Sequence, residues 1–143
     1  MARHAPFVPL RIMSSYSMLE GAIDPKDIAK LAKERGFPAI AICDRNGLYG
    51  VVAFAEACFR EGVQPIIGTL LGVARDAAGK QVDYLPLYAQ DEAGYDNLCH
   101  LVSKAHLDRP LEYEPHVALA DLDGHTDGLI ALSGGAEGAM SRL

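Results

Sequence analysis

The chain has 143 residues, half of them apolar, with a mean hydropathy of +0.07 and a formal net charge of −6. This length suffices for one domain with a core, and the composition excludes a disordered or membrane-spanning chain. The acidic balance argues against a module that grips DNA, which usually carries a basic face, and leaves a solvated acidic surface or a docking face for a protein partner.

The first predicted elements are a strand, a loop and a helix. Residues 7–12 form an expected apolar strand, and residues 14–21 form an expected polar loop. The helix begins after Asp24, which suits the N-cap, carries Pro25 in its first turn, and ends at Gly36.

The same order of signals then returns. A β-run at residues 39–43 and a turn at residues 44–47 precede a second helix over roughly residues 50–61, a glycine and a strand at residues 66–67. Continuous apolar strands between helices predict a parallel sheet that is covered on both faces.

The second half predicts a hairpin, a third helix and a last strand. In chain order we expect a strand at 70–73, a turn at 75–79, a strand at 83–89, a helix at 91–105, a loop at 107–116, a short helix at 117–122 and an apolar strand at 128–132. Strands that alternate with helices give an α/β class, and about four units are too few for a closed barrel. The chain is therefore expected to be an open sandwich or a truncated piece of a barrel.

Cysteine usage and the N-terminus predict a cytoplasmic protein. Cys43, Cys58 and Cys99 lie far apart without a C-x-x-C spacing, which argues against a disulfide framework or a zinc knuckle. We expect them to be small buried residues in a reducing compartment. The first residues lack the apolar core of a signal peptide.

Six ordered blocks carry a resemblance to a known family. Residues 7–21, FVPLRIMSSYSMLEG, are similar to a family opening that reads F-V-H-L-H-x-H-S-x-Y-S-L-L-D-G. Residues 39–47, AIAICDRNG, and 62–68, GVQPIIG, resemble its A-I-T-D-H-G-N and G-I-K-P-I-I-G blocks. Blocks at residues 93–98, 101–105 and 128–134 continue the match. The sequence thereby resembles the N-terminal PHP (polymerase and histidinol phosphatase) domain of bacterial DNA polymerase III alpha subunits, alphaproteobacterial ones above all.

The resemblance implies a fold and a role. It implies that residues 1–143 are the N-terminal portion of one PHP domain, a truncated part of a distorted (β/α)7 barrel with mostly parallel strands, and that polymerase palm, fingers and thumb are absent from this chain. The parent would be a DNA-directed DNA polymerase, the replicase or an error-prone paralogue, with Mg²⁺ in its polymerase domain. The fragment would need no cofactor and would serve as a non-catalytic scaffold. Its partners would be the proofreading exonuclease subunit and other replicase subunits, with DNA bound through the parent and no membrane contact.

The metal-binding positions of the family are mostly replaced here. The resemblance places the family's ligand residues at Pro9, Arg11, Met13, Glu20, Asp44, Arg45, Leu70 and Tyr84. Imidazoles and carboxylates hold such ions, whereas arginine cannot shed its proton to become a ligand. Only Asp44 and Glu20 keep ligand chemistry, so we expect a degenerate site with no metal and no catalytic residue.

We hypothesise that arginine side chains replace the positive charge of the lost metal ions. Asp44 and Glu20 would be partly buried carboxylates without a counterion, which is costly. A guanidinium can satisfy a carboxylate bidentately, so Arg11 and Arg45 would supply the positive charge. The alternative is that both arginines point to solvent.

Two rival functions and several weaker motifs complete the sequence-based picture. An active metal-dependent phosphoesterase or 3′–5′ exonuclease would need the lost ligands, and a stand-alone α/β binding protein would lack barrel strands. Ser14 and Ser17 have no histidine base nearby, and the five histidines show no ligand spacing. Tyr16 and Tyr95 are expected to be packing residues rather than base-stacking platforms.

Overall fold

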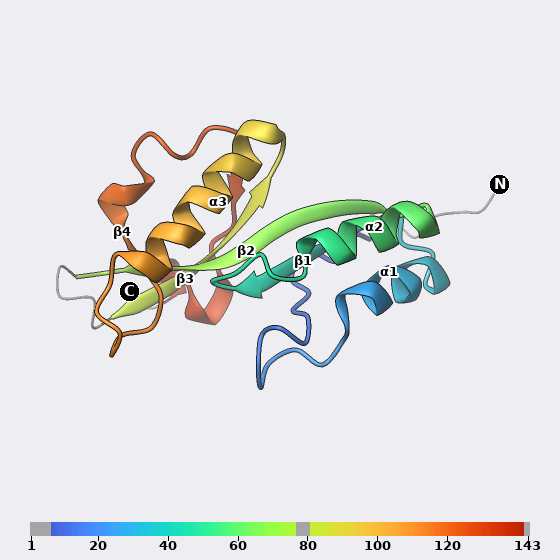
Figure 1. Cartoon of the computed structure of the whole chain (residues 1–143), viewed down its shortest axis with the longest axis horizontal. Coiled ribbons are helices and arrows are strands. Elements are labelled where there is room, and N and C mark those ends of the chain that lie inside the picture. The colour runs from blue at the N-terminus through green and yellow to red at the C-terminus, as the bar shows by residue number, and fades with distance from the viewer. Residues whose placement is uncertain (1–6, 77–80, 142–143) are drawn as a thin grey trace. The chain divides into compact units, whose positions relative to one another are not determined.

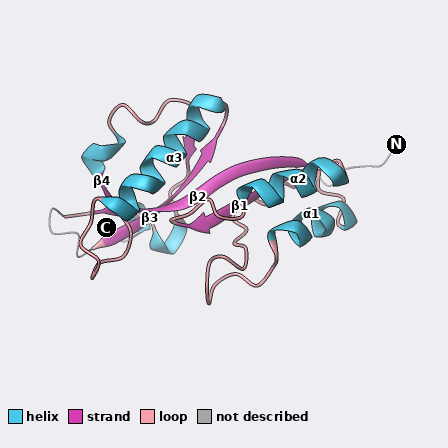
Figure 2. Cartoon of the chain, viewed as in Figure 1, coloured by secondary structure: helices cyan, strands magenta, loops and turns pink. Residues whose placement is uncertain are grey.

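The computed structural model describes residues 7–76 and 81–141 (Figures 1 and 2). Its elements are α1 (Pro25–Glu34), β1 (Ala39–Arg45), α2 (Val51–Glu61), β2 (Gln64–Ala74), β3 (Val82–Ala89), α3 (Glu92–Leu107), β4 (Val117–Ala118), the 3₁₀ turn η1 (Leu119–Leu122), β5 (Leu129–Ala131), and the 3₁₀ turns η2 (Gly135–Glu137) and η3 (Ala139–Ser141). Across these described residues, no helix has the length and apolar character needed to cross a membrane.

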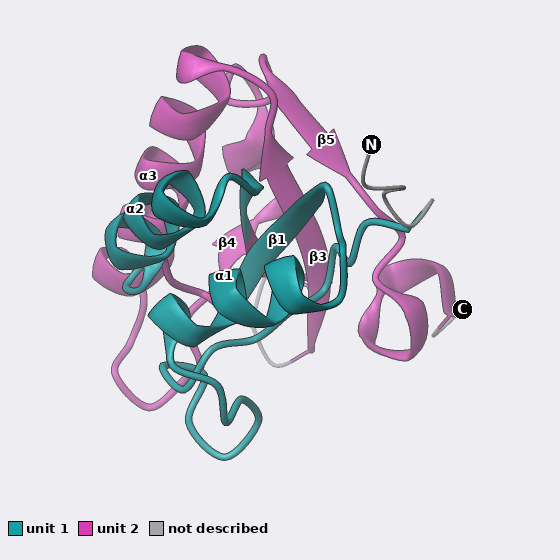
Figure 3. Ribbon diagram, turned by 90° about the vertical axis from the view of Figure 1, so that its right-hand side faces the viewer, with its two compact units in different colours: residues 1–44, 49–68 teal, residues 45–48, 69–143 magenta. Residues whose placement is uncertain are grey.

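The chain forms two compact units (Figure 3). Unit 1 comprises residues 1–44 and 49–68, and unit 2 comprises residues 45–48 and 69–143. The units interleave along the sequence, and strand β2 begins in unit 1 and ends in unit 2. The boundary within β1 places Asp44 in unit 1 and Arg45 in unit 2.

The predicted punctuation of α1 is confirmed. The Asp24 carboxylate accepts a hydrogen bond from the Lys26 backbone N–H at 2.9 Å, which satisfies one of the unpaired donors of the first turn. Gly36, just after the helix, has a φ of 72°, a left-handed conformation that favours glycine. Helix α1 packs against α2, and the two helices lie side by side in Figure 1. Ile28 and Ala32 of α1 are buried.

Strand β1 extends further than the sequence suggested. Residues 40–44 are all buried, and the strand runs through Asp44 to Arg45. The turn expected at residues 44–47 therefore begins only at Asn46, which has a φ of 48°. Helix α2 and its glycine end are confirmed, because Gly62 takes a left-handed φ of 70°.

The segment at residues 7–12 is not a regular strand, so that prediction is wrong. Backbone N–H groups of Ala41 and Cys43 donate to the carbonyls of Pro9 and Ile12 at 2.9 and 2.8 Å. The two donors on β1 are two residues apart, whereas their acceptors on the segment are three residues apart. This unequal spacing breaks the regular hydrogen-bond ladder. Proline also removes one backbone donor.

The strands form one hydrogen-bonded series, and the α/β class is confirmed. The order is β1-β2-β3-β5, and β4 also pairs with β2. Strand β4 is parallel to β2, with Val73 opposite Val117, whereas β5 is antiparallel to β3, with Tyr88 opposite Ile130. The short helix expected at residues 117–122 is instead a two-residue strand followed by a 3₁₀ turn.

Helix α3 is confirmed and begins at a close backbone contact. The Asp91 carboxylate accepts a hydrogen bond from the Gly94 N–H at 2.9 Å. A Cβ atom at Gly94 would lie 2.0 Å from the Gly128 carbonyl oxygen, so the glycine is required by space. The turn predicted at residues 75–79 lies partly outside the described residues, and β3 follows as expected.

The cysteines largely match the prediction. Cys43 and Cys58 are buried and Cys99 is half-buried. Burial raises the pKa of the Cys58 thiol to about 11, which disfavours the reactive thiolate.

Candidate functional site

Asp44 is the retained carboxylate of unit 1, and it is enclosed by hydrogen-bond donors. Its side chain is almost fully buried at 2% exposure. Oδ1 accepts hydrogen bonds from the Ser14 backbone N–H at 2.7 Å and from Ser17 Oγ at 2.8 Å. Oδ2 accepts a hydrogen bond from Ser14 Oγ at 2.7 Å. These donors satisfy hydrogen-bond acceptor positions of a carboxylate that is removed from water.

The loop that presents these donors is fixed by its own backbone. Ser15 N–H donates to the Ile23 carbonyl at 2.8 Å, and Gly21 N–H donates to the Ser17 carbonyl at 2.8 Å. A Cβ atom at Gly21 would lie 1.9 Å from the Ser14 carbonyl oxygen, so only glycine fits there. The loop therefore holds Ser14 and Ser17 toward Asp44 in a preformed arrangement. We call residues 14–21 the serine loop.

The serine loop corrects one sequence-based expectation. Glu20 is exposed, so it is not the partly buried carboxylate that needs a counterion. Tyr16 is 54% exposed and its ring centroid lies 6.3 Å from that of Tyr49, so its packing contact is with an aromatic ring outside the core. The sequence suggested Ser14 and Ser17 only as possible nucleophiles, whereas the structure shows them as donors to Asp44.

The other predicted positions of unit 1 differ in their exposure. Arg11 lies on the surface, and Pro9 and Met13 are half-buried. Pro9 lines an apolar cavity of about 140 Å³ together with Ile12 and Ile28. The proposed pairing of Arg11 with a carboxylate stays a prediction.

Arg45 contacts two side chains of unit 2. Its Nη2 lies 2.9 Å from Glu137 Oε1, and the side chains are 20% and 35% exposed. The guanidinium carbon lies 4.1 Å from the centroid of the Tyr84 ring, a cation–π contact. Arg45 thus binds a carboxylate and an aromatic face that sequence analysis did not assign to it.

Tyr84, which the resemblance predicts at a family histidine position, acts as a neutral donor. Its side chain is 7% exposed, and its hydroxyl donates a hydrogen bond to Glu114 Oε2. Burial, followed by the hydrogen bond and the negative charge of Glu114, raises the pKa of Tyr84 to about 12, against the opposing effect of Arg45. The phenol therefore stays protonated throughout the physiological pH range.

Leu70 belongs to the core, and Asn46 fixes the strand that carries it. Leu70 is fully buried and offers no lone pair from its side chain. Asn46 N–H donates to the Leu70 carbonyl at 2.9 Å, and Asn46 Oδ1 accepts from the Gly72 N–H at 2.7 Å. Asn46 Nδ2 donates to the Pro115 carbonyl at 2.9 Å. Asn46 is thus a structural residue at the turn after β1.

Three histidines of unit 2 have defined contacts. The ring of His106 contacts the Asn46 carbonyl at 2.7 Å, and the rings of His100 and His125 stack at 3.9 Å between centroids. Within residues 7–76 and 81–141, no three His, Cys, Asp or Glu side chains gather in a way that could hold a metal ion. The predicted site positions therefore form an Asp44–serine cluster in unit 1 and an Arg45–Tyr84–Glu137 cluster in unit 2.

Comparison with known proteins finds relatives that are much longer than this chain. A DNA polymerase III subunit alpha from Caulobacter vibrioides (strain NA1000 / CB15N) is 42% identical over 142 residues, which cover 96% of this chain and 12% of that protein. An error-prone DNA polymerase from Anaeromyxobacter sp. (strain K) is 39% identical over 150 residues, covering 98% of this chain and 13% of that protein. The chain therefore spans only a small part of the curated relatives that it matches.

A solved structure and a family match agree on the fold. The structure of an amidohydrolase from Chromobacterium violaceum, with bound sulfate and no metal, superposes with a TM-score of 0.54 at 20% sequence identity, covering 68% of this chain and 32% of that one. This likeness supports the fold alone. Residues 9–143 match the PHP domain family over nearly the whole sequence. The chain therefore belongs to the PHP domain family.

Proposed function

We propose that this chain is the N-terminal PHP region of a DNA polymerase III alpha subunit and acts there as a non-catalytic scaffold and interaction module. The relatives that cover 95% or more of this chain include alpha subunits from several bacteria. Residues 1–143 would be the first portion of one PHP domain. Polymerisation, with Mg²⁺ bound in a separate polymerase domain, would belong to the parent protein.

The observation that carries the non-catalytic role is the state of Asp44. A metal ligand needs a carboxylate lone pair that points into an open site. Here both oxygens of Asp44 accept hydrogen bonds from the serine loop at 2.7–2.8 Å. Leu70 and Tyr84 present a core side chain and a protonated phenol at two further family positions. The donor set therefore does not fit a multinuclear metal centre.

Arg45 extends this proposal to unit 2. We infer that its guanidinium is a fixed positive charge where the family has a metal-binding histidine. Its counterion is Glu137 and its second contact is Tyr84. The expected pairing of Arg45 with Asp44 or Glu20 stays a prediction. The arginine would stabilise the local fold instead of serving chemistry.

Partners and location follow from the proposed parent. The scaffold would bind the proofreading exonuclease subunit and other replicase subunits in the cytoplasm, and DNA would contact the parent chain elsewhere. The fragment itself would need no cofactor. An active phosphoesterase or 3′–5′ exonuclease is the competing function, and it is less well supported because it requires ligands that the sequence has replaced.

A hydrolysis assay separates these two functions. The chain is incubated with Zn²⁺, Mn²⁺ or Mg²⁺ and either a chromogenic phosphodiester or an end-labelled single-stranded oligonucleotide. We expect no metal-stimulated release of product above the level of the Asp44→Asn variant. The matched control is Asp27→Asn, which changes an exposed carboxylate on α1. Release that depends on metal and disappears only in Asp44→Asn would establish the phosphoesterase function instead.

A further inference from the structure

The formal net negative charge of the chain belongs to one unit. The residues of unit 1 include seven acidic and seven basic side chains, whereas those of unit 2 include twelve acidic and six basic ones. Unit 2 therefore carries the whole formal net charge of −6. A surface with this charge repels phosphate groups and attracts cationic partners.

Unit 2 also contains an apolar cavity of about 310 Å³, which is large enough for bulky side chains of a partner. Val73, Leu85, Leu119 and Leu122 contribute to its walls. Leu119 is 70% exposed, which is unusual for a large apolar side chain that lines a cavity.

The two charged side chains in the wall of this cavity bind each other. Arg75 Nε and Nη2 donate to Asp83 Oδ2 and Oδ1 at 2.9 and 2.7 Å, a bidentate pair. Asp83 is 6% exposed, so its charge is satisfied at the wall. The cavity therefore offers mainly apolar contact to an occupant.

An acidic cleft of about 140 Å³ shares a wall with this cavity. Ala74 lines both hollows, and η1 contributes Leu119 and Leu122 to the cavity and Asp121 to the cleft. The cleft also includes the carboxylates of Asp76 and Asp108. An apolar subsite and an anionic subsite are thus neighbours, and both are lined by Ala74 and by residues of η1.

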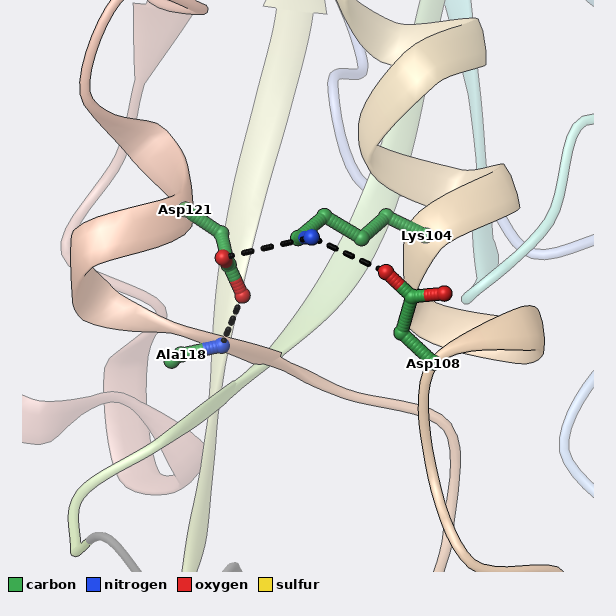
Figure 4. A network of polar contacts seen from close by, with 4 residues as sticks. All are labelled: Lys104, Asp108, Ala118 and Asp121. Carbon is green, nitrogen blue, oxygen red and sulfur yellow. Dashed lines mark hydrogen bonds and ion pairs between the residues drawn. The ribbon is translucent and has the colours of Figure 1, made fainter.

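Lys104 lies between the carboxylates of Asp108 and Asp121, as Figure 4 shows. Its Nζ lies 2.9 Å from Asp108 Oδ2 and 3.5 Å from Asp121 Oδ1. The hydrogen bond to Asp108 and the nearby negative charges raise the pKa of Lys104, so it stays charged. Asp121 Oδ2 also accepts a hydrogen bond from the Ala118 N–H at 2.8 Å. One ammonium therefore pairs with two carboxylates, Asp108 and Asp121, and this group of three side chains keeps a negative excess.

We propose that these two hollows form a docking cleft for a protein segment in which a bulky apolar residue lies next to lysine or arginine. The apolar residue would enter the cavity, and the cationic residue would reach the cleft beside Asp108. Charge complementarity favours a basic protein segment over a nucleic acid, whose phosphates unit 2 would repel. This inference rests on the proposed role as an interaction module.

Fluorescence polarisation with short peptides tests the docking cleft. The probe is a labelled seven-residue peptide that alternates leucine with lysine, added to the full 143-residue chain. Two comparison peptides carry glutamate in place of lysine, or alanine in place of leucine. We expect the leucine–lysine peptide to bind at least about tenfold more tightly than either comparison peptide, with affinity that falls as salt rises.

Variants of exposed residues locate the binding. Leu119→Ser and Asp108→Asn should each weaken binding by roughly fivefold to tenfold. Both side chains are largely exposed, at 70% for Leu119 and 59% for Asp108, so the fold should tolerate the changes. Phe59→Ser and Glu56→Gln are matched controls on the exposed face of α2 and should leave the affinity unchanged.

Three results would overturn the docking cleft. They are equal binding of all three peptides, absence of saturable binding by the leucine–lysine peptide, and equal effects of the control and cleft variants. The assay involves neither metal nor hydrolysis. A failure here therefore removes the docking cleft alone, whereas metal-dependent hydrolysis would remove the non-catalytic role without changing peptide binding.

Discussion

The Asp44→Ala variant should be less stable than the wild-type chain by about 3–5 kcal/mol. The substitution removes the acceptor of three hydrogen bonds and leaves the Ser14 N–H and two serine hydroxyls in a buried place. Buried donors without acceptors lose their hydration and gain nothing in exchange. Urea unfolding followed by far-ultraviolet circular dichroism measures the change in the free energy of unfolding.

Two control variants are compared with Asp44→Ala in the same unfolding experiment. Asp44→Asn keeps the shape and one acceptor oxygen, so we expect a smaller loss of about 1–2 kcal/mol. Asp27→Ala removes an exposed carboxylate that pairs with Lys30 and should cost less than about 1 kcal/mol. If Asp44→Ala proved no more damaging than Asp27→Ala, the serine loop would not depend on Asp44 for its structure.

The Gly21→Ala variant should be less stable by about 2–3 kcal/mol, because a methyl group cannot fit there. Its Cβ would lie 1.9 Å from the Ser14 carbonyl oxygen and 2.8 Å from the Met13 carbonyl oxygen. Both contacts are with backbone, which must move to relieve them. The movement would pull Ser14 away from Asp44 and weaken the hydrogen bonds there.

Gly36→Ala is the control for Gly21→Ala in the same unfolding experiment. Gly36 has open space around its Cβ position but a φ of +72°, so alanine should cost only about 1 kcal/mol of backbone strain. A loss for Gly21→Ala that merely equalled the loss for Gly36→Ala would mean that the serine loop adapts to the added methyl group. The serine loop would then not be preformed.

Elements marked by local chemistry could be predicted from the sequence. Helix α1 has a capping carboxylate at Asp24, a proline in its first turn and a left-handed glycine at its end, each acting within a few residues. Helix α2 shares the left-handed glycine at its end, Gly62, and a proline, Pro65, follows at the start of β2. Such contacts depend on near neighbours in the chain, so their pattern is visible without a structure.

Features set by distant partners could not be predicted in this way. Ser14 binds Asp44 across 30 residues, and Arg45 binds Glu137 across 92. The residues around 117–122 looked helical, but pairing of Val117 with β2 takes the first two residues into a strand. At residues 7–12, apolar composition predicted a strand that an uneven spacing of hydrogen bonds to β1 prevents.

The same distinction between local and distant features applies to the candidate site. The resemblance to PHP domains predicted the replaced ligand positions from the sequence. That the leucine and arginine positions hold no metal ligand follows from residue type, because neither side chain can coordinate a metal. The partners of Asp44, Arg45 and Tyr84 required coordinates. The hydrogen-bond partners given above are serines and glutamates, residue types that no sequence pattern singles out here.

The metal content of the purified chain tests the central claim most directly. The chain is incubated with Zn²⁺ and Mn²⁺, dialysed against metal-free buffer and analysed by mass spectrometry of the elements, alongside the Asp44→Asn variant. We predict no stoichiometric metal in either protein, because Asp44 is held by Ser14 and Ser17. One or more tightly bound ions per wild-type chain, lost in Asp44→Asn, would contradict the proposed non-catalytic scaffold and restore the phosphoesterase function.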